Sequence, residues 1–137
     1  EHEKYMRLAL EEAIEAGTLT DTPESVAVLL RELAHPAIRF LWQPAPERPP
    51  QSHLSELRQV LPRLANLHVY QWSGPAHARV RHPLADGADV WPTYLATAED
   101  GTPHWALLEF VRDDSPEQFL RDAATLHAWL AGCVSEK

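Results

Sequence analysis

Apolar positions recur along the chain with two alternating periods, one typical of helices and one typical of short buried strands. Residues 3–16 carry apolar side chains at helical spacing, and this pattern stops at Gly17. Thr22 and the proline after it supply an N-cap and a first helical residue, which predicts a helix over 23–34. The apolar run 37–42 is too short for a helix and predicts a strand.

The alternation of helix and strand continues to the end of the sequence. Ser52 or Ser55 is expected to cap the next helix. The remaining elements are expected in this order: a helix over 53–64, a strand over 67–72, a loop over 73–86, a helix over 87–98, a strand over 104–111 and a last helix. The buried face of the last helix is expected to consist of Phe119, Leu120, Ala123, Leu126 and Leu130.

The expected strands are apolar on both faces instead of alternating, which is typical of parallel strands covered by helices. Regular alternation of helix and strand indicates an α/β fold with a parallel sheet. The chain has 137 residues, whereas a complete (β/α)8 barrel needs roughly 250. The sequence therefore predicts one domain over 1–137 that is built of parallel βα units, three strands plus flanking helices, and is too short for a complete barrel.

Composition and charge exclude several classes of partner. Twenty acidic residues against twelve basic ones give a net charge of −8, and no segment gathers the basic residues, so nucleic acid is not an expected partner. No apolar run approaches the roughly 20 residues that span a bilayer, so no membrane partner is expected. Cys133 is the only cysteine, which excludes an internal disulfide and fits a reducing compartment. These features predict a cytoplasmic protein.

Two side chains near the carboxyl ends of the expected strands are candidates for chemistry, because sites in parallel α/β folds form at these ends. Glu109 lies in the apolar run 107–111, where a carboxylate is costly to bury unless it is paired, hydrogen-bonded or bound to a metal. His68 lies in the preceding strand. Together they would suit a divalent metal or an acid–base pair. Taken singly, Glu109 also suits a structural ion pair and His68 a satisfied core imidazole.

Aromatic, amide and basic residues near the same strand ends are candidates for substrate binding. Trp42 and Trp72 would stack on a sugar-like ligand or cap the core. Arg79 and Arg81, in the loop after the second strand, would hold a carboxylate or phosphate or lie in solvent. Gln43 directly follows Trp42 and is a polar candidate at the end of the first strand.

Several short motifs follow one another in a fixed order from Gly17 to Leu130. They are GTLTDTPES at 17–25, WQP at 42–44, LHVYQW at 67–72, PLADG at 83–87 with Trp91 and Tyr94, LLEFVRDDSPEQF at 107–119 and DAA at 122–124. In this order and spacing they resemble the C-terminal half of the sugar phosphate isomerase/epimerase family, the xylose isomerase-like TIM barrels. The resemblance covers most of the chain, and it implies that the three strands and their flanking helices form part, about half, of a TIM barrel.

The resemblance implies a divalent metal (Mn, Mg, Co or Zn) that holds adjacent oxygens of a sugar or sugar phosphate while a base moves a proton. It assigns metal binding and catalysis to His68 and Glu109. The residues that would line the substrate pocket are Trp42, Gln43, Trp72, Arg79 and Arg81. Gln43 stands at or beside a position where the family has an Asp ligand. The family's fifth strand, with a further Glu ligand, would lie between Gly17 and Thr18, where the sequence runs straight on.

Two functions from different classes follow. The first is metal-assisted proton transfer on a sugar or sugar-like substrate, by a fragment or half-barrel with an incomplete site. The alternative is a non-catalytic or engineered half-barrel that serves as a scaffold or interaction domain. Part of a barrel has open strand edges and an uncovered inner face, so both predict a homo-oligomer or a complementing half-barrel. A flavodoxin-like domain is less favoured, because no glycine-rich phosphate loop is present.

Overall fold

The computed structural model describes residues 22–32, 35, 37–45 and 47–135. The helix expected over 3–16 and the junction between Gly17 and Thr18 lie outside these residues. The described elements are α2 (Pro23–Glu32), β1 (Phe40–Trp42), α3 (Pro50–Val60), β2 (Leu64–Val69), β3 (Gln71–Ser73), β4 (Val80–His82), α4 (Trp91–Ala98), β5 (Trp105–Leu108) and α5 (Pro116–Ser135).

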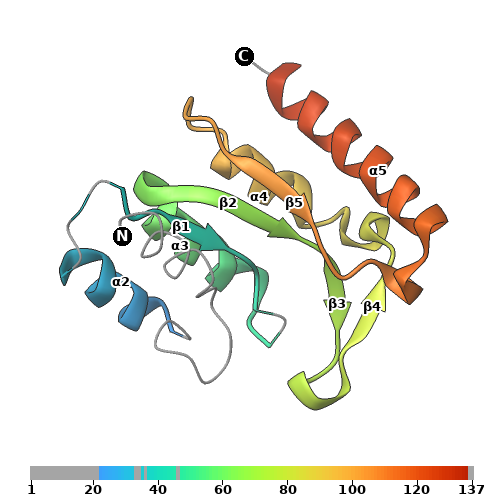
Figure 1. Ribbon diagram of the computed structural model, residues 1–137, viewed down its shortest axis with the longest axis horizontal. Coiled ribbons are helices and arrows are strands. Elements are labelled where there is room, and N and C mark those ends of the chain that lie inside the picture. Colours follow the sequence, from blue (N-terminus) through green and yellow to red (C-terminus); the bar gives the residue numbers. More distant parts are fainter. Residues whose placement is uncertain (1–21, 33–34, 36, 46, 136–137) are drawn as a thin grey trace, which may run out of the picture.

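Three strands form a parallel sheet in the order β1-β2-β5, as the sequence predicts (Figure 1). In the central strand β2, Leu67 pairs with Trp42 of β1, and Val69 pairs with Leu108 of β5. α3 connects β1 to β2, and α4 lies in the connection from β2 to β5, so helices provide both crossovers. The fold is therefore mixed α/β. The outer strands are shorter than expected, and the sheet formed by the described strands is open and does not close into a barrel.

A second sheet of two strands replaces part of the loop expected over 73–86. β3 and β4 pair antiparallel, with Trp72 opposite Arg81. Gly74, which follows β3, has φ +85°, and a Cβ at this position would lie 2.6 Å from the carbonyl oxygen of Ala78. The strand expected over 67–72 is consequently divided between β2 and β3, which Tyr70 separates.

The first two described helices begin at different signals. α2 follows Thr22, whose Oγ1 accepts a hydrogen bond from the backbone N–H of Ser25 at 3.2 Å, so the expected N-cap is confirmed. α3 begins at Pro50, earlier than expected, and the prediction that Ser52 or Ser55 caps it was wrong. The reason is that proline suits the first helical turn, where its missing N–H would have had no helical partner.

The helices form a row against one face of the parallel sheet. α2 contacts α3, α3 contacts α4 and α4 contacts α5, and Figure 1 shows them arranged from α2 at the left to α5 at the right. Apolar side chains of these helices, of β1 and of β2 form the hydrophobic core. Trp42, Trp91 and Tyr94 are its largest fully buried members and meet one another edge to face.

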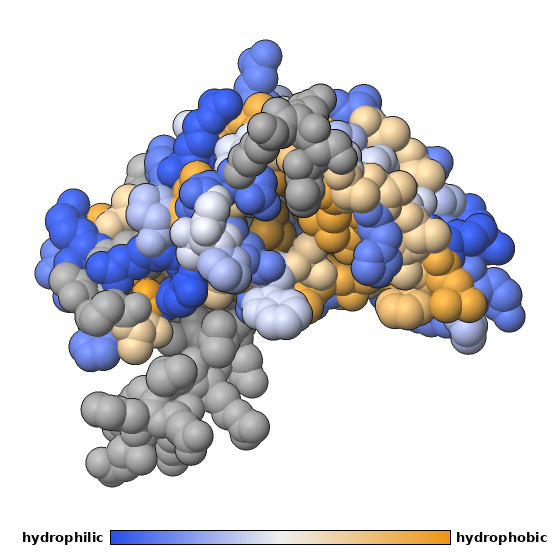
Figure 2. Space-filling model, turned by 90° about the horizontal axis from the view of Figure 1, so that it is seen from above, coloured by the Kyte–Doolittle hydropathy of each residue, from blue (hydrophilic) through white to orange (hydrophobic). Residues whose placement is uncertain are grey.

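α5 buries a different face from the one that its apolar residues predict. Leu126 is buried as expected, whereas Phe119, Leu120 and Leu130 are exposed. Figure 2 shows apolar surface on the side of the molecule where α5 lies. None of the described helices, α5 included, is long and apolar enough to cross a membrane.

Two polar residues of α5 occupy buried positions instead. Gln118 and Asp122 lie one helical turn apart, and both are buried. Oδ1 of Asp122 accepts hydrogen bonds from the Leu84 backbone N–H at 2.9 Å and from Nε2 of Gln118 at 2.8 Å. Because these bonds satisfy the buried polar groups, they select the face of α5 that packs against the rest of the protein.

The other face of the parallel sheet carries alternate residues of β2 and β5. The register pairs Asn66 with Trp105 and His68 with Leu107. Trp105 is 72% exposed and Leu107 is 40% exposed. We call the surface formed by Asn66, His68, Trp105, Leu107 and Glu109 the open face.

We expect Gly87→Ala to destabilise the protein. A Cβ at Gly87 would lie 2.5 Å from Oε1 of Gln71 and 2.6 Å from Cδ1 of the buried Trp91 ring. Overpacking of this kind costs roughly 1–3 kcal/mol, which urea unfolding would measure as a loss of unfolding free energy. Gly132→Ala in α5 meets nothing within 4 Å and should be neutral or slightly stabilising. Wild-type stability of Gly87→Ala would contradict this prediction.

Candidate functional site

The parallel strands point their carboxyl ends to one edge of the sheet, which brings the residues that follow them together. The Glu109 backbone N–H donates to the Val69 carbonyl oxygen at 3.1 Å, so the pairing of β2 with β5 continues beyond β5. The buried hydroxyl of Tyr70 donates to the Pro44 carbonyl oxygen at 2.6 Å. The residue after β2 is therefore tied to the segment after β1.

His68 and Glu109 contact each other on the open face at this edge. His68 pairs in register with Leu107, and Glu109 lies two residues farther along, so its carboxylate reaches the imidazole. Nδ1 of His68 lies 2.7 Å from Oε2 of Glu109, and the two side chains are 15% and 31% exposed. The structure brings these two residues together, as the sequence predicts. Their roles in metal binding and catalysis stay predictions.

The environment of His68 favours a neutral imidazole. Burial lowers the pKa of His68 below its ordinary value, and the Glu109 carboxylate, which would favour a charged ring, does not offset this effect. A proton on Nδ1, facing the carboxylate, leaves Nε2 as a hydrogen-bond acceptor. Nε2 has no hydrogen-bond partner among the residues that the structure describes. The pair has the arrangement of a general base with an orienting carboxylate.

An aromatic cluster of Tyr70, Trp72 and Phe110 adjoins this pair. The ring of Trp72 lies 4.4 Å from each of the other two rings, measured between centroids. Phe110 directly follows Glu109 and has φ +51°, a left-handed conformation that is strained for an aromatic residue. Trp72, predicted as a stacking surface or a core cap, thus has aromatic neighbours from within the protein.

Arg79 and Arg81 are both ion-paired. Nη2 of Arg79 lies 2.9 Å from Oε1 of Glu47, and its guanidinium lies 4.8 Å from the centroid of the Trp72 ring. Nη1 of Arg81 lies 2.6 Å from Oδ1 of Asp114. A substrate anion at either arginine would have to compete with a carboxylate that is already present.

The remaining predicted residues lie at the end of β1. Trp42 is completely buried against Trp91 and Tyr94, so no ligand reaches its ring in this conformation. Gln43 is half-buried and follows it at the carboxyl edge.

His53 and Tyr94 form a buried polar pair that the sequence reasoning missed. Nδ1 of His53 lies 2.9 Å from the Tyr94 hydroxyl, and Nε2 lies 2.8 Å from the Ala45 carbonyl oxygen. Burial, with smaller effects from nearby acidic residues, raises the pKa of Tyr94 to about 12. The sequence pattern could have indicated the burial of His53, because this residue lies one helical turn before Leu57 and hence on the buried face of α3.

A cavity of about 250 Å³ lies between the segments that follow β1 and β2. Arg48, Gln71 and Asp89 are among its polar lining residues. Nη1 of Arg48 lies 2.6 Å from Oε1 of the buried Glu56, so a carboxylate neutralises its charge. Neither His68 nor Glu109 lines this cavity.

His68 and Glu109 are two potential donors for the divalent metal that the resemblance implies. Their nearest atoms are in direct contact at 2.7 Å, whereas a cation bound by both in ideal geometry holds such atoms roughly 3 Å or more apart. No cluster of three or more His, Cys, Asp or Glu suited to a metal occurs in the described part of the chain. In this conformation the pair alone does not form a metal site.

No protein-family model matches the sequence, and no curated protein matches it. The resemblance to the sugar phosphate isomerase/epimerase family therefore rests on the sequence motifs.

We expect His68 to make the protein less stable at mildly acidic pH. The pKa of His68 is lowered in the folded state, so the unfolded chain binds the proton more readily, and the unfolding free energy falls as the pH drops through about 6.5. His68→Gln should show a smaller fall when urea unfolding is measured between about pH 8 and about pH 5. His127→Gln, at an exposed position of α5, should retain the wild-type dependence. If the unfolding free energy of His68→Gln fell as much as that of the wild type, the pH dependence would not come from His68.

Proposed function

We propose that the chain is part of a sugar isomerase/epimerase-like barrel, of which the three parallel strands form about half. In this proposal His68 and Glu109 transfer a proton on a sugar or sugar phosphate. The observation that carries it is the 2.7 Å contact between Nδ1 of His68 and Oε2 of Glu109 at the carboxyl edge of a parallel sheet. The resemblance of the sequence motifs to those of the family supplies the substrate class.

The chemistry assigned to the pair is proton transfer without net oxidation. Nε2 of His68 takes a proton from a substrate carbon next to a carbonyl group. In an isomerisation the proton returns to the former carbonyl carbon, while the hydroxyl proton of the first carbon passes to the former carbonyl oxygen. In an epimerisation a proton returns to the other face of the same carbon. Because burial keeps the imidazole neutral beforehand, it is able to accept the proton. The Glu109 carboxylate then stabilises the imidazolium that forms.

A divalent metal (Mn, Mg, Co or Zn) belongs to the same proposal. When bound, it would polarise the substrate oxygens. His68 and Glu109 supply two donors, so the other ligands would come from a partner chain or from residues outside the described part. No step of the proton transfer above depends on the metal.

A non-catalytic half-barrel that self-associates is the second candidate function. Its supporting observation is the exposure of Trp105 and Leu107 on the open face, next to the unpaired edge of β5 in the described sheet. A second copy of the chain, or a complementing half-barrel, would bury both side chains and cover an edge that otherwise favours aggregation. Such an assembly is also compatible with catalysis, because it would complete the site.

We expect the wild-type protein to catalyse exchange of a substrate C–H proton in D2O. Proton NMR would follow a panel of aldoses, ketoses and their phosphates, each with and without Mn²⁺, Mg²⁺, Co²⁺ or Zn²⁺. His68→Gln and Glu109→Gln should lower the rate by roughly a hundredfold or more, the usual range for loss of a general base. His77→Gln, at an exposed position, is the matched control. A lack of exchange across the panel, or equal rates in the variants, would rule out the catalytic proposal.

We expect the wild-type protein to form a dimer or a larger oligomer in sedimentation equilibrium at micromolar concentration. Trp105→Lys and Leu107→Lys should shift it toward monomer, because each places a charge on the face to be buried. Leu120→Lys, at an exposed position of α5, should leave the oligomer unchanged. A folded wild-type monomer at all concentrations would exclude self-association, whatever the exchange assay shows.

A further inference from the structure

Ser73 and His82 are in contact on the β3–β4 hairpin. Oγ of Ser73 lies 2.6 Å from Nε2 of His82. A serine hydroxyl at this distance from an imidazole nitrogen has the arrangement in which a base activates a nucleophile. Neither residue belongs to the pair of His68 and Glu109, so the inference is independent of the function proposed for that pair.

A substrate is able to approach the Ser73 hydroxyl. Ser73 is exposed and His82 is half-buried. Figure 1 shows the hairpin projecting away from the parallel sheet, beyond the end of β2. The contact between the two side chains therefore lies at the surface of the protein and not in its core.

The imidazole is able to accept the serine proton. When the proton of a neutral His82 ring is on Nδ1, Nε2 accepts a hydrogen bond from the Ser73 hydroxyl. No residue in the described part of the chain forms a hydrogen bond with Nδ1 of His82, whereas a complete catalytic triad has a carboxylate at this position. A dyad of this kind suits esters better than amides, because an alcohol leaves more readily than an amine.

Gln71 adds an amide to the same face of the hairpin. It pairs in register with His82, and Val80 pairs with Ser73, so alternation along the strands places all four side chains on one face. The Gln71 side chain is half-buried and has no hydrogen-bond partner among the residues that the structure describes. A glutamine N–H group of this kind is able to stabilise the oxyanion that forms in acyl transfer.

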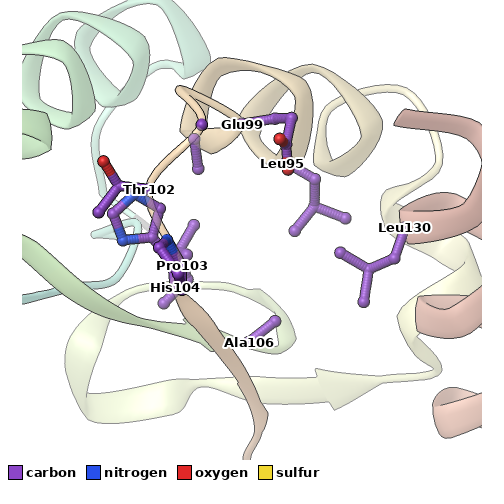
Figure 3. Close-up of a pocket in the computed structure, with 10 residues that line it drawn as sticks. Leu95, Glu99, Thr102, Pro103, His104, Ala106 and Leu130 are labelled. Atoms are coloured by element: carbon purple, nitrogen blue, oxygen red, sulfur yellow. The ribbon is translucent and has the colours of Figure 1, made fainter. Parts of the chain in front are cut away.

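Apolar surface and a small cavity adjoin this face. Val80 is 53% exposed. Gln71 lines the cavity of about 250 Å³ described above, together with Pro50 and Val90. This volume lies below the usual range for drug-sized ligands, roughly 300–1,000 Å³, so the surroundings favour a small ester with short apolar groups. The larger cavity in Figure 3, of about 320 Å³, lies where β5 begins and is lined by none of these residues.

We propose that the β3–β4 hairpin hydrolyses small carboxylic esters, with Ser73 as the nucleophile and His82 as the base. Oγ of Ser73 forms a bond to the acyl carbon while its proton passes to Nε2 of His82. The C–O bond of the ester breaks, and the leaving alcohol takes this proton. Water then attacks the acyl carbon and gives a proton to Nε2. The carboxylic acid leaves as this proton returns to Oγ, and the Gln71 amide donates to the carbonyl oxygen in both steps.

The ester p-nitrophenyl acetate tests the proposal, because its acyl group is small and its product absorbs visible light. The wild-type protein should release p-nitrophenolate and carry an acetyl group on Ser73, located by peptide mass spectrometry. Ser73→Ala and His82→Gln should lower the rate roughly a hundredfold. Gln at position 82 is still able to form a hydrogen bond with Ser73 but does not take its proton. Equal rates in the wild type and Ser73→Ala, or acetyl groups on other residues only, would overturn the proposal.

Two variants serve as matched controls. Ser55→Ala removes an exposed hydroxyl from α3, and His77→Gln removes an exposed imidazole from the turn of the same hairpin. Both should react as the wild type does, and urea unfolding would verify that every variant is folded. Gln71→Met removes the amide at similar volume and should slow acetylation roughly tenfold or more. A rate in His77→Gln as low as that in His82→Gln would show that exposed imidazoles attack the ester directly, which would refute the roles of Ser73 and His82.

Discussion

The arrangement of the protein depends on the central position of β2. This strand is paired along both edges, so its register fixes the positions of β1 and β5 at the same time. Leu67 and Val69 belong to the core, whereas His68 lies on the open face. A slip of one residue would exchange the two faces of the strand. It would place an imidazole in the core and remove the contact with Glu109.

Features that depend on local spacing could be predicted from the sequence. The α2 cap at Thr22 and the order of helices and strands follow from short patterns. The contact between His68 and Glu109 was predictable as well, because neighbouring parallel strands place residues of the same face side by side. The break between β2 and β3 was not, because Tyr70 and Trp72 continue the apolar run across it.

Features that depend on distant partners could not be predicted. Arg79 pairs with Glu47, and Arg81 with Asp114, across separations of 32 and 33 residues, and no local pattern selects these partners. The buried face of α5 was mispredicted for the same reason. The apolar residues of α5 predict a buried face that excludes Asp122. A hydrogen bond to Asp122 from the backbone of Leu84, 38 residues away, makes burial of that carboxylate favourable.

The segment after Glu109 has a strained backbone. Phe110, Asp113 and Asp114 all have positive φ, and such conformations cost roughly 1–3 kcal/mol each outside glycine. Contacts from the β3–β4 hairpin oppose this strain: Trp72 packs on Phe110, and Arg81 binds Asp114. The hairpin therefore helps to hold the segment that directly follows Glu109 in its strained conformation, although the hairpin shares no strand with the parallel sheet.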